Sequence, residues 1–418
     1  MMTGRERVQT VLSHREADTI ALDLGATSVT GIHVKMIAAY RRHYGLEDRP
    51  VKVTEPFQML GEVDEELAKI WNIDIIGAGG KTDMFGHQQK DYTERRMPWG
   101  QTVLLPGSFK MKEENGNIYV FPQGDTDYSP TAVMPAGGYF FDAIERTPPT
   151  AFDAELLIED NLEEFVRMTD DDMPYWKEKL TAARATGKAV IANIGGTGFG
   201  DIALVPGLNL KKPKGVRDLT DWYMSTVIRT DFVMEIFERQ LEIALHNLEK
   251  INRIAGDCID ILFVCGTDLG TQNSQFCSAE HLSALHGVPY RKINDWVHRN
   301  TGWKTFKHSC GAIVPLMETF IDCGFDIINP VQINAKDMDP RFLKKEFGDR
   351  ITFWGGGIDT QRTLQTGTPQ QVRDEVHQLC DIFGAGGGFV FNTVHNLQAN
   401  TPMANAIALM DAVCEIRN

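Results

Sequence analysis

Short runs of apolar residues recur along the whole chain, and each run ends in a glycine or a small polar residue. These runs lie at 19–27, 73–80, 188–196, 259–270, 304–311, 325–332, 351–359 and 388–396. They are nearly continuous in apolar residues and do not alternate with polar ones. Runs of this kind predict strands that are buried on both faces of a parallel sheet.

Amphipathic helical patterns separate most of these runs. They cover 219–256, 312–324, 368–386 and 401–416. The last two open with Thr-Pro, which places the proline near a helix start, where its missing N–H costs little. Strands that alternate with helices in this way favour an α/β fold of the (β/α)₈ TIM-barrel type over an open, doubly wound sheet.

Residues 81–150 depart from the alternation. They include "MPWGQTVLLPGSFKMKEENGNIYVFPQGDT" (97–126), which contains the turn signal "ENGN" (114–117) and has no helix-length period. We therefore expect a single barrel domain over 1–418 that carries a β-rich insertion at 81–150, near its N-terminal third. Such an insertion would form a lid over the substrate entrance or an interface.

The composition indicates a soluble globular protein, with 42% hydrophobic and 24% charged residues. The sequence has no apolar run of membrane-spanning length, and the first residues are too polar for a secretory signal. A formal net charge of −15 argues against nucleic acid or an anionic membrane as a partner. All seven cysteines lie between Cys258 and Cys414. This odd, clustered set predicts reduced thiols and a cytoplasmic location.

Polar residues gather at the predicted carboxyl ends of the strands, where barrels of this kind place their active sites. They are Asp23, Asn193, Cys265, Asp268, His308, Cys310, Asn329, Gln332, Asp359, Asn392 and His395. Such residues also form ordinary turns, so each one alone has a structural alternative. Asn193, Asp359 and Asn392 are candidates for substrate binding on this basis.

His308 and Cys310 form the most informative pair, because residues two apart on a strand point to the same side. Both side chains could face the barrel mouth and reach one ion. Imidazole and thiolate together suit Zn²⁺, which takes nitrogen and sulfur ligands in tetrahedral geometry. Gly311 would then let the backbone turn sharply into the next helix. Two ordinary structural residues remain the alternative.

Several stretches make the chain similar to the uroporphyrinogen decarboxylase superfamily. They are "HSCG" (308–311), "GTDLGTQNSQFCSAEHL" (266–282), "WGGGIDTQRTLQTGTPQQVRDEV" (354–376), "NTVHNLQANTPMANAIALMDAV" (392–413) and the opening segment 5–46. The order of these motifs is specific from about residue 260 onward, and roughly 81–180 lies outside the resemblance.

The superfamily has two main branches, and the resemblance favours one of them. Its true decarboxylases carry an arginine-rich motif after the first strand, which grips substrate carboxylates. This chain has no arginine between Arg15 and Arg41. The other branch contains zinc- and corrinoid-dependent methyltransferases, of the methylcobamide:coenzyme M and O-demethylase types. Its members carry His-x-Cys on this strand and a third ligand on the last strand.

The resemblance to the methyltransferase branch implies a zinc ion held by His308, Cys310 and His395. His395 stands where that branch often has cysteine. Cys265 is a rival for the third position, since its strand neighbours the one that carries His308. Asp268 would be a catalytic residue that orients the substrate or handles a proton. Its structural alternative is to cap its own loop.

The function implied is methyl transfer between a small methylated substrate or a thiol and a corrinoid, with zinc as the Lewis acid. The corrinoid, as methylcobalamin or cob(I)alamin, would be carried by a separate corrinoid-binding protein. A metal-free decarboxylase or lyase and a non-catalytic tetrapyrrole-binding protein are the alternatives. The sequence leaves open the methylated substrate, the direction of transfer and the oligomeric state, for which a homodimer is one option.

Overall fold

The computed structural model describes residues 1–151 and 153–417, and an eight-stranded parallel sheet lies at its centre. The strands follow one another in chain order: β1 (Ala21–Leu22), β5 (Ile75–Ala78), β12 (Ala189–Asn193), β13 (Ile261–Cys265), β14 (Lys304–His308), β15 (Ile327–Asn329), β16 (Thr352–Trp354) and β17 (Phe389–Phe391). Each predicted apolar run contains one of these strands. The predicted (β/α)₈ barrel is confirmed.

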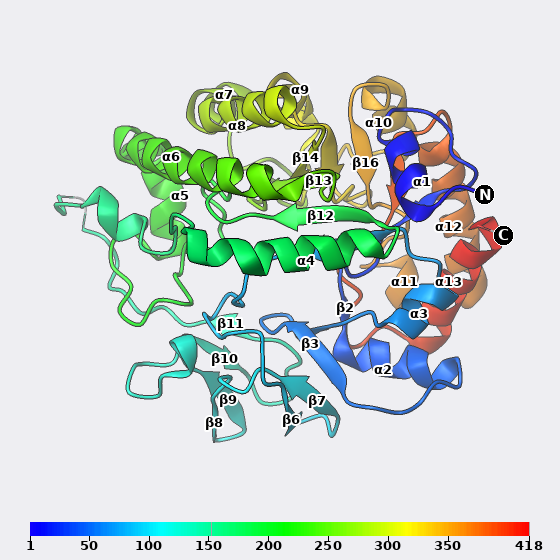
Figure 1. Ribbon diagram of the computed structural model, residues 1–418, viewed down its shortest axis with the longest axis horizontal. Helices are drawn as coiled ribbons and strands as arrows, with labels where there is room; N and C mark the ends of the chain where they lie inside the picture. Colours follow the sequence, from blue (N-terminus) through cyan, green and yellow to red (C-terminus); the bar gives the residue numbers. More distant parts are fainter. Residues whose placement is uncertain (152, 418) are drawn as a thin grey trace.

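Helices cover the outside of the barrel. They are α1 (Gly4–Val11), α2 (Val34–His43), α3 (Glu65–Ile70), α4 (Met173–Ala185), α5 (Leu219–Ile228), α6 (Thr230–Ala255), α7 (Ala279–Leu285), α8 (Gly287–Asn300), α9 (Met317–Asp322), α10 (Pro340–Phe347), α11 (Thr363–Thr366), α12 (Pro369–Gly384) and α13 (Met403–Arg417). Figure 1 shows α4 and α6 flanking β12. In the described part of the chain, no helix is both long and apolar enough to cross a membrane.

The long helix predicted over 219–256 is divided into α5 and α6. Arg229 lies between them with φ −133° and ψ 42°, which is outside the helical region. The expectation of one helix was wrong because the amphipathic pattern continues across the break.

The barrel closes where β1 meets β5, and Asp74 makes the contact. Its backbone N–H donates to the carbonyl of Leu22 (3.0 Å), and its Oδ2 accepts from the Leu22 N–H (2.9 Å). Arg7 from α1 and Arg417 from α13 both bind this carboxylate, at 2.5 and 2.9 Å. The two ends of the chain therefore meet at this seam, as Figure 1 also shows.

Two further strands begin with the same arrangement. Asp260 precedes β13, and its Oδ2 accepts from the N–H of Val190 in β12 (3.0 Å). Asp326 precedes β15, and its Oδ2 accepts from the N–H of Thr305 in β14 (2.8 Å). In both cases the aspartate N–H also donates to the same strand, to the carbonyls of Val190 and Thr305. These aspartates join neighbouring strands by hydrogen bonds at the amino end of the barrel.

One apolar cluster fills the barrel interior. Its strand residues are Ala21, Ile75, Ala189, Ile191, Ile261, Phe263, Phe306, Ile327, Trp354 and Val390, and α1 with the residue after it adds Val8, Val11 and Leu12. Side chains alternate along a strand, so the next inward position lies two residues further on. Those positions are Asp23, Asn193, His308, Asn329 and Asn392. The polar residues predicted at the strand ends thus form a layer above the apolar interior.

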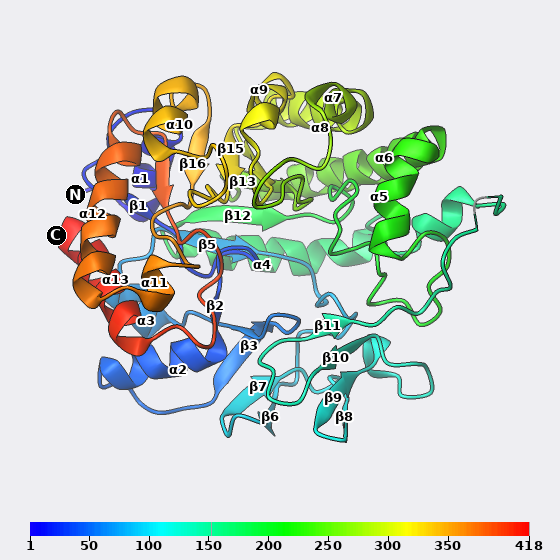
Figure 2. The same ribbon diagram turned by 180° about the vertical axis from the view of Figure 1, so that it is seen from behind.

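Two small sheets lie beside the barrel, on the side of α2 (Figure 2). One contains β8 (Met111–Glu114), β9 (Asn117–Val120), β10 (Ala132–Met134) and β11 (Asp142–Ala143); the other contains β2 (Ile32–His33), β3 (Val51–Glu55), β4 (Leu60–Gly61), β6 (Thr93–Arg96) and β7 (Thr102–Leu105). The predicted turn joins β8 to β9 through Asn115 and Gly116, with φ 52° and 79°. Paired positive φ angles are typical of a two-residue hairpin turn.

The β-rich character of the insertion near the N-terminal third is confirmed, but its sheet is shared. β3, which precedes the second barrel strand, pairs with β7 through Val51 and Val103. The Phe141 N–H donates to the carbonyl of Phe57 (2.8 Å), and Thr131 Oγ1 donates to the carbonyl of Leu208 (2.9 Å). The segment 81–150 is therefore packed against the first β/α connection and against a loop that follows β12.

Candidate metal centre

A histidine, a cysteine and an aspartate meet at the carboxyl ends of β13 and β14. His308 is the last residue of β14, Cys310 follows two residues later, and Asp268 lies in the loop after β13. His308 Nε2 is 3.6 Å from Cys310 Sγ and 3.4 Å from Asp268 Oδ1. The three ligand atoms lie within 4.8 Å of one another. Among residues 1–151 and 153–417, these three side chains are the one group of this kind that could hold a metal ion.

Close backbone packing brings the two segments together. Gly311 has φ +95°, and a Cβ there would lie 2.3 Å from the carbonyl carbon of Gly270. Glycine is therefore required for this contact, and the sharp turn predicted at Gly311 is present. The Cys310 N–H donates to Asp268 Oδ1 (2.7 Å), and the Leu269 N–H donates to Ser309 Oγ (2.9 Å).

Asn329 determines which nitrogen of His308 faces the site. The Asn329 side-chain N–H donates to the carbonyl of Trp354 (2.9 Å), so its Oδ1 is left to accept. His308 Nδ1 lies 2.6 Å from that oxygen and therefore carries the hydrogen. Nε2 is left directed at Cys310 and Asp268. A hydrogen bond from the other ring nitrogen to a neighbouring oxygen is the usual way to orient a metal-binding histidine.

The three groups perturb one another strongly. Burial by itself would lower the pKa of His308, but the interactions with Cys310 and Asp268 raise that pKa well above its usual value. Burial would raise the pKa of Asp268, but the bond to His308 lowers it to about 2. Burial also raises the pKa of Cys310, against the effect of His308. The charges of the site therefore favour a positive charge at His308, beside Cys310 and Asp268.

The residues present fit a zinc ion. The group supplies one imidazole nitrogen, one sulfur and one carboxylate oxygen, which are the donor types that zinc takes. Cys310 and Asp268 are partly exposed, so a substrate could approach the ion from the barrel mouth. A catalytic zinc site needs such an open position.

His395, the third ligand implied by the family resemblance, lies near this group but outside it. The residue keeps access to solvent although protein atoms crowd around its ring, and its Nδ1 is 3.4 Å from Gln398 Nε2. Burial of the ring by surrounding atoms and the charge of His308 lower its pKa, whereas Asp268 raises it. His395 therefore shares the electrostatic environment of the site. Its role as a ligand stays a prediction.

Cys265, the rival third ligand, is fully buried and engaged elsewhere. Its Sγ lies 3.0 Å from Thr267 Oγ1, accepts a hydrogen bond from the Tyr290 hydroxyl (3.3 Å) and donates to the carbonyl of Phe199 (3.5 Å). It does not belong to the metal-competent group formed by the described residues.

Asp359 has a clear structural role. Its Oδ1 accepts from the N–H groups of Gln361 and Arg362, at 2.8 and 3.0 Å, and from the side chain of Asn334 (2.9 Å). These bonds cap the turn that follows β16, which is the structural alternative noted for such residues. A substrate contact by Asp359 stays a prediction.

Asn193 and Asn392 lie in the inward-facing layer, in different surroundings. Asn193 ends β12 with an exposed side chain, so it is open to the barrel mouth. Asn392 is fully buried, and its Nδ2 donates to the carbonyl of Asp23 (2.8 Å). Its Oδ1 has no hydrogen-bond partner among the described residues. Both remain predicted substrate contacts.

Asp23 is a buried carboxylate for which the sequence suggested no role. Its oxygens accept from Trp354 Nε1 (3.0 Å) and from the Ala26 N–H (3.1 Å). Burial raises its pKa to about 6. A charged residue at the end of an apolar strand was visible in the sequence, but its burial was not.

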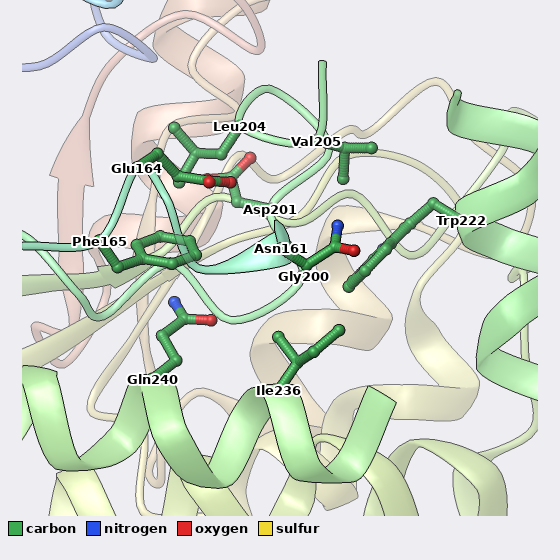
Figure 3. Close-up of a pocket in the computed structure, with 11 residues that line it drawn as sticks. Asn161, Glu164, Phe165, Gly200, Asp201, Leu204, Val205, Trp222, Ile236 and Gln240 are labelled. Atoms are coloured by element: carbon green, nitrogen blue, oxygen red, sulfur yellow. The ribbon is translucent and has the colours of Figure 1, made fainter. Parts of the chain in front are cut away.

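A small cavity borders the loop that leads to Asp268. Its volume is about 20 Å³, and Asp201, Glu164 and Gln240 are among its lining residues. Figure 3 shows these three polar side chains around the same space. Asp201 Oδ2 accepts from the N–H of Gly266 (3.1 Å), two residues before Asp268. This hydrogen bond connects a residue of the cavity wall to the loop that carries Asp268.

Part of the chain is similar to a family of known proteins. The family described as "Uroporphyrinogen decarboxylase (URO-D)" matches residues 261–416. Uroporphyrinogen decarboxylase from Psychromonas ingrahamii is 32% identical over 100 residues, which cover 24% of the chain and 26% of that relative. The enzyme from Pseudoalteromonas translucida is 32% identical over 72 residues, covering 17% of the chain and 20% of the relative. The matched part thus spans about a quarter or less of these relatives.

A solved structure extends the similarity to the whole fold. A methyltransferase from Methanosarcina mazei aligns with a TM-score of 0.54 at 12% identity, covering 99% of each chain. At this level of identity the match concerns the fold. The matched family region, 261–416, contains Asp268, His308, Cys310 and His395.

Proposed function

We propose that the protein is a zinc-dependent methyltransferase of the uroporphyrinogen decarboxylase superfamily, whose family description matches residues 261–416. It would move a methyl group between a small methylated molecule or a thiol and a corrinoid on a partner protein. The observation that carries this proposal is the group of Asp268, His308 and Cys310 at the barrel mouth, with His308 Nε2 oriented toward the other two.

Each residue of the site has a role in this proposal. His308 and Cys310 would hold the zinc ion, and His395 would approach it from the end of β17. The bound ion would act as a Lewis acid that favours the thiolate of a thiol substrate, or polarises the oxygen of an ether or alcohol. Asp268, which is ionised because its pKa is about 2, would accept a hydrogen bond from the substrate and orient it.

The lack of arginines in and just after the first strand argues against a porphyrinogen substrate. The chain has none between Arg15 and Arg41. Arg41 is bound on the outside of the barrel, where its Nη2 contacts Glu66 (2.9 Å) and its Nη1 contacts Asp64. A substrate with many carboxylates would need free cations at the mouth.

Helix α5 offers a surface on which a corrinoid-binding partner could dock. The Tyr223 hydroxyl donates to the carbonyl of Asp268 (3.2 Å), so this helix contacts the site loop. Its outer face exposes Met224 (50%), Val227 (68%) and Ile228 (45%). Figure 2 shows α5 beyond the carboxyl end of β12. An apolar face beside the site supports delivery of the methyl group by another protein.

The test is a spectroscopic assay of corrinoid methylation. Purified protein loaded with zinc is mixed with cob(I)alamin and with methoxyaromatics, methylamines, methylated glycines or methyl thiols in turn. The proposal expects conversion to methylcobalamin with one of these classes, or the reverse conversion with an acceptor thiol. Cys310→Ser is the matched control and should abolish the conversion.

Three results would contradict the proposal. Absence of conversion across the whole panel, with zinc bound, would remove the methyltransferase assignment. Carbon dioxide release from a porphyrinogen by metal-free protein would favour the decarboxylase. Tight binding of a tetrapyrrole without any turnover would favour the non-catalytic alternative.

A further inference from the structure

Lys307 is a buried lysine immediately beside the metal group. It lies between Phe306 and His308 on β14, and both of these neighbours point into the barrel. Alternation therefore directs Lys307 outward, where its Nζ lies 5.8 Å from the rings of Tyr290 and Phe320. The residue is 0% exposed.

Within residues 1–151 and 153–417, no aspartate or glutamate forms an ion pair with Lys307. A charged group buried in this way costs free energy unless its hydrogen bonds are satisfied. Lys307 Nζ donates to the carbonyl of Thr267 (2.8 Å) and to the carbonyl of His308. Both acceptors belong to the segments that carry the metal group.

The two carbonyls bound by Lys307 explain how the site is aligned. Thr267 immediately precedes Asp268, and His308 is the histidine of the group. A single ammonium group therefore joins the loop after β13 to the end of β14. The contacts of Ser309 and Cys310, the Ala312 N–H bond to the Thr271 carbonyl (2.8 Å) and the close approach of Gly270 and Gly311 join the same segments, and Lys307 adds bonds directly beside Asp268 and at His308 itself. The positive charge also favours the ionised form of Asp268, since Lys307 contributes to the lowering of the Asp268 pKa.

We propose that Lys307 is a positioning residue of the metal centre, which holds the Asp268 loop against His308 through the carbonyls of Thr267 and His308. This inference rests on the proposed metal site. It adds a residue that touches neither metal nor substrate, and it predicts that removal of the Lys307 ammonium group loosens the donor geometry while the barrel stays folded.

Two variants separate the hydrogen bonds of Lys307 from its charge. Lys307→Met removes both and keeps a similar shape, whereas Lys307→Gln keeps N–H donors without the charge. Zinc affinity is measured by competition with a chelator, and geometry by the thiolate-to-cobalt absorption band of the Co²⁺-loaded protein. Lys307→Met should weaken zinc binding by about tenfold or more and alter that band, as changes to residues that orient metal ligands do. Lys307→Gln should fall between Lys307→Met and the native protein.

The matched control is Lys304→Met, on the same strand. Lys304 Nζ binds Asp326 Oδ1 (2.8 Å) at the other end of β14. This variant should lose stability in urea unfolding without any change in zinc affinity or in the cobalt spectrum. The control shows whether loss of a β14 lysine affects the site in general.

Every outcome decides the inference. Native zinc affinity and spectrum in folded Lys307→Met would overturn it and leave the proposed function intact. Failure of both Lys307 variants to fold would assign the residue to the core and would also overturn it. A native protein that binds no zinc would remove the proposed function together with this inference. Zinc binding without methyl transfer would contradict the function alone.

Discussion

The two ends of the barrel each contain a carboxylate that neighbouring groups bind, but these neighbouring groups differ in kind. At the amino end, Asp74 is bound by Arg7 and Arg417, and both of its oxygens are engaged. At the carboxyl end, Asp268 faces the imidazole of His308 and the backbone N–H of Cys310. The carboxylate of Asp74 is paired with two arginines, which stay charged. The Asp268 site contains groups that can exchange a proton for a metal ion.

This difference separates stability from chemistry on one scaffold. Arginine stays charged at all accessible pH values, so the two cations that bind Asp74 at the seam between β1 and β5 do not themselves titrate. Asp260 and Asp326 repeat the arrangement with Arg5 and Lys304, at 2.8 Å each. In TIM barrels the amino end generally serves stability and the carboxyl end serves catalysis. The next four experiments test this division.

The largest expected effect is at the seam. Asp74→Asn should lower the free energy of unfolding by about 3–5 kcal/mol, because it leaves two buried arginines without their carboxylate. Urea unfolding of the metal-free protein measures this. Asp268→Asn, the equivalent change at the other end, should cost much less stability. Equal losses for the two variants would contradict the division.

Cys310→Ser should remove most of the zinc and leave the fold intact. The thiol is partly exposed and adds little to the packing, so the metal-free variant should unfold within about 1 kcal/mol of the native protein. Elemental analysis and urea unfolding check the two statements. Cys414→Ser on α13 is the control and should keep its zinc. A Cys310→Ser protein with a full complement of zinc would mean that Cys310 is not a ligand.

The third ligand is decided by comparing His395→Ala with Cys265→Ser. If His395 binds the ion from β17, its loss should weaken zinc binding by at least about tenfold. Loss of a ligand should cost no less affinity than loss of a residue that only orients a ligand. Cys265→Ser should change zinc affinity little, because that thiol is engaged by Thr267 and Tyr290. The opposite ranking in a chelator competition would transfer the role to Cys265.

The smallest effect concerns the pH dependence of stability at Asp23. Burial raises its pKa from 3.8 to about 6, so the folded protein binds this proton more tightly than the unfolded chain. The contribution of Asp23 to stability is therefore greatest below pH 4 and declines as the pH rises to 6.

Asp23→Asn should flatten that decline and change stability above pH 6 by only about 1 kcal/mol. The gain from removing a buried charge is offset because one amide oxygen must accept from both Trp354 and Ala26. Urea unfolding at a series of pH values is the measurement. An unchanged slope between pH 4 and 6 would show that Asp23 does not titrate there.

Most of the fold could be predicted because buried parallel strands have a local signature. Each apolar run contained a barrel strand, and the hairpin at Asn115 and Gly116 followed from its turn residues. The strands between residues 32 and 61 were not predicted. β2 and β4 have two residues each and are defined by their pairing, which a pattern along the chain does not record.

The site was predictable in part for the same reason. The His308–Cys310 pair follows from the two-residue repeat of a strand. Asp268 was a candidate from its place after a strand, but its contact with the pair spans about 40 residues of chain. Lys307 was not predicted to belong to the site, because lysine is usually a surface residue and its burial is visible only in the structure.

The sequence by itself determined the number and order of the barrel strands, the hairpin turn and the local pair of metal-competent side chains. These features depend on residues a few positions apart. Only the tertiary structure decided that Asp268 meets His308, that Asn329 orients the ring, and that Lys307 joins the two segments. Those contacts exist because β13, β14 and β15 lie side by side in the closed barrel, and strand neighbours are set by the packing of the whole chain.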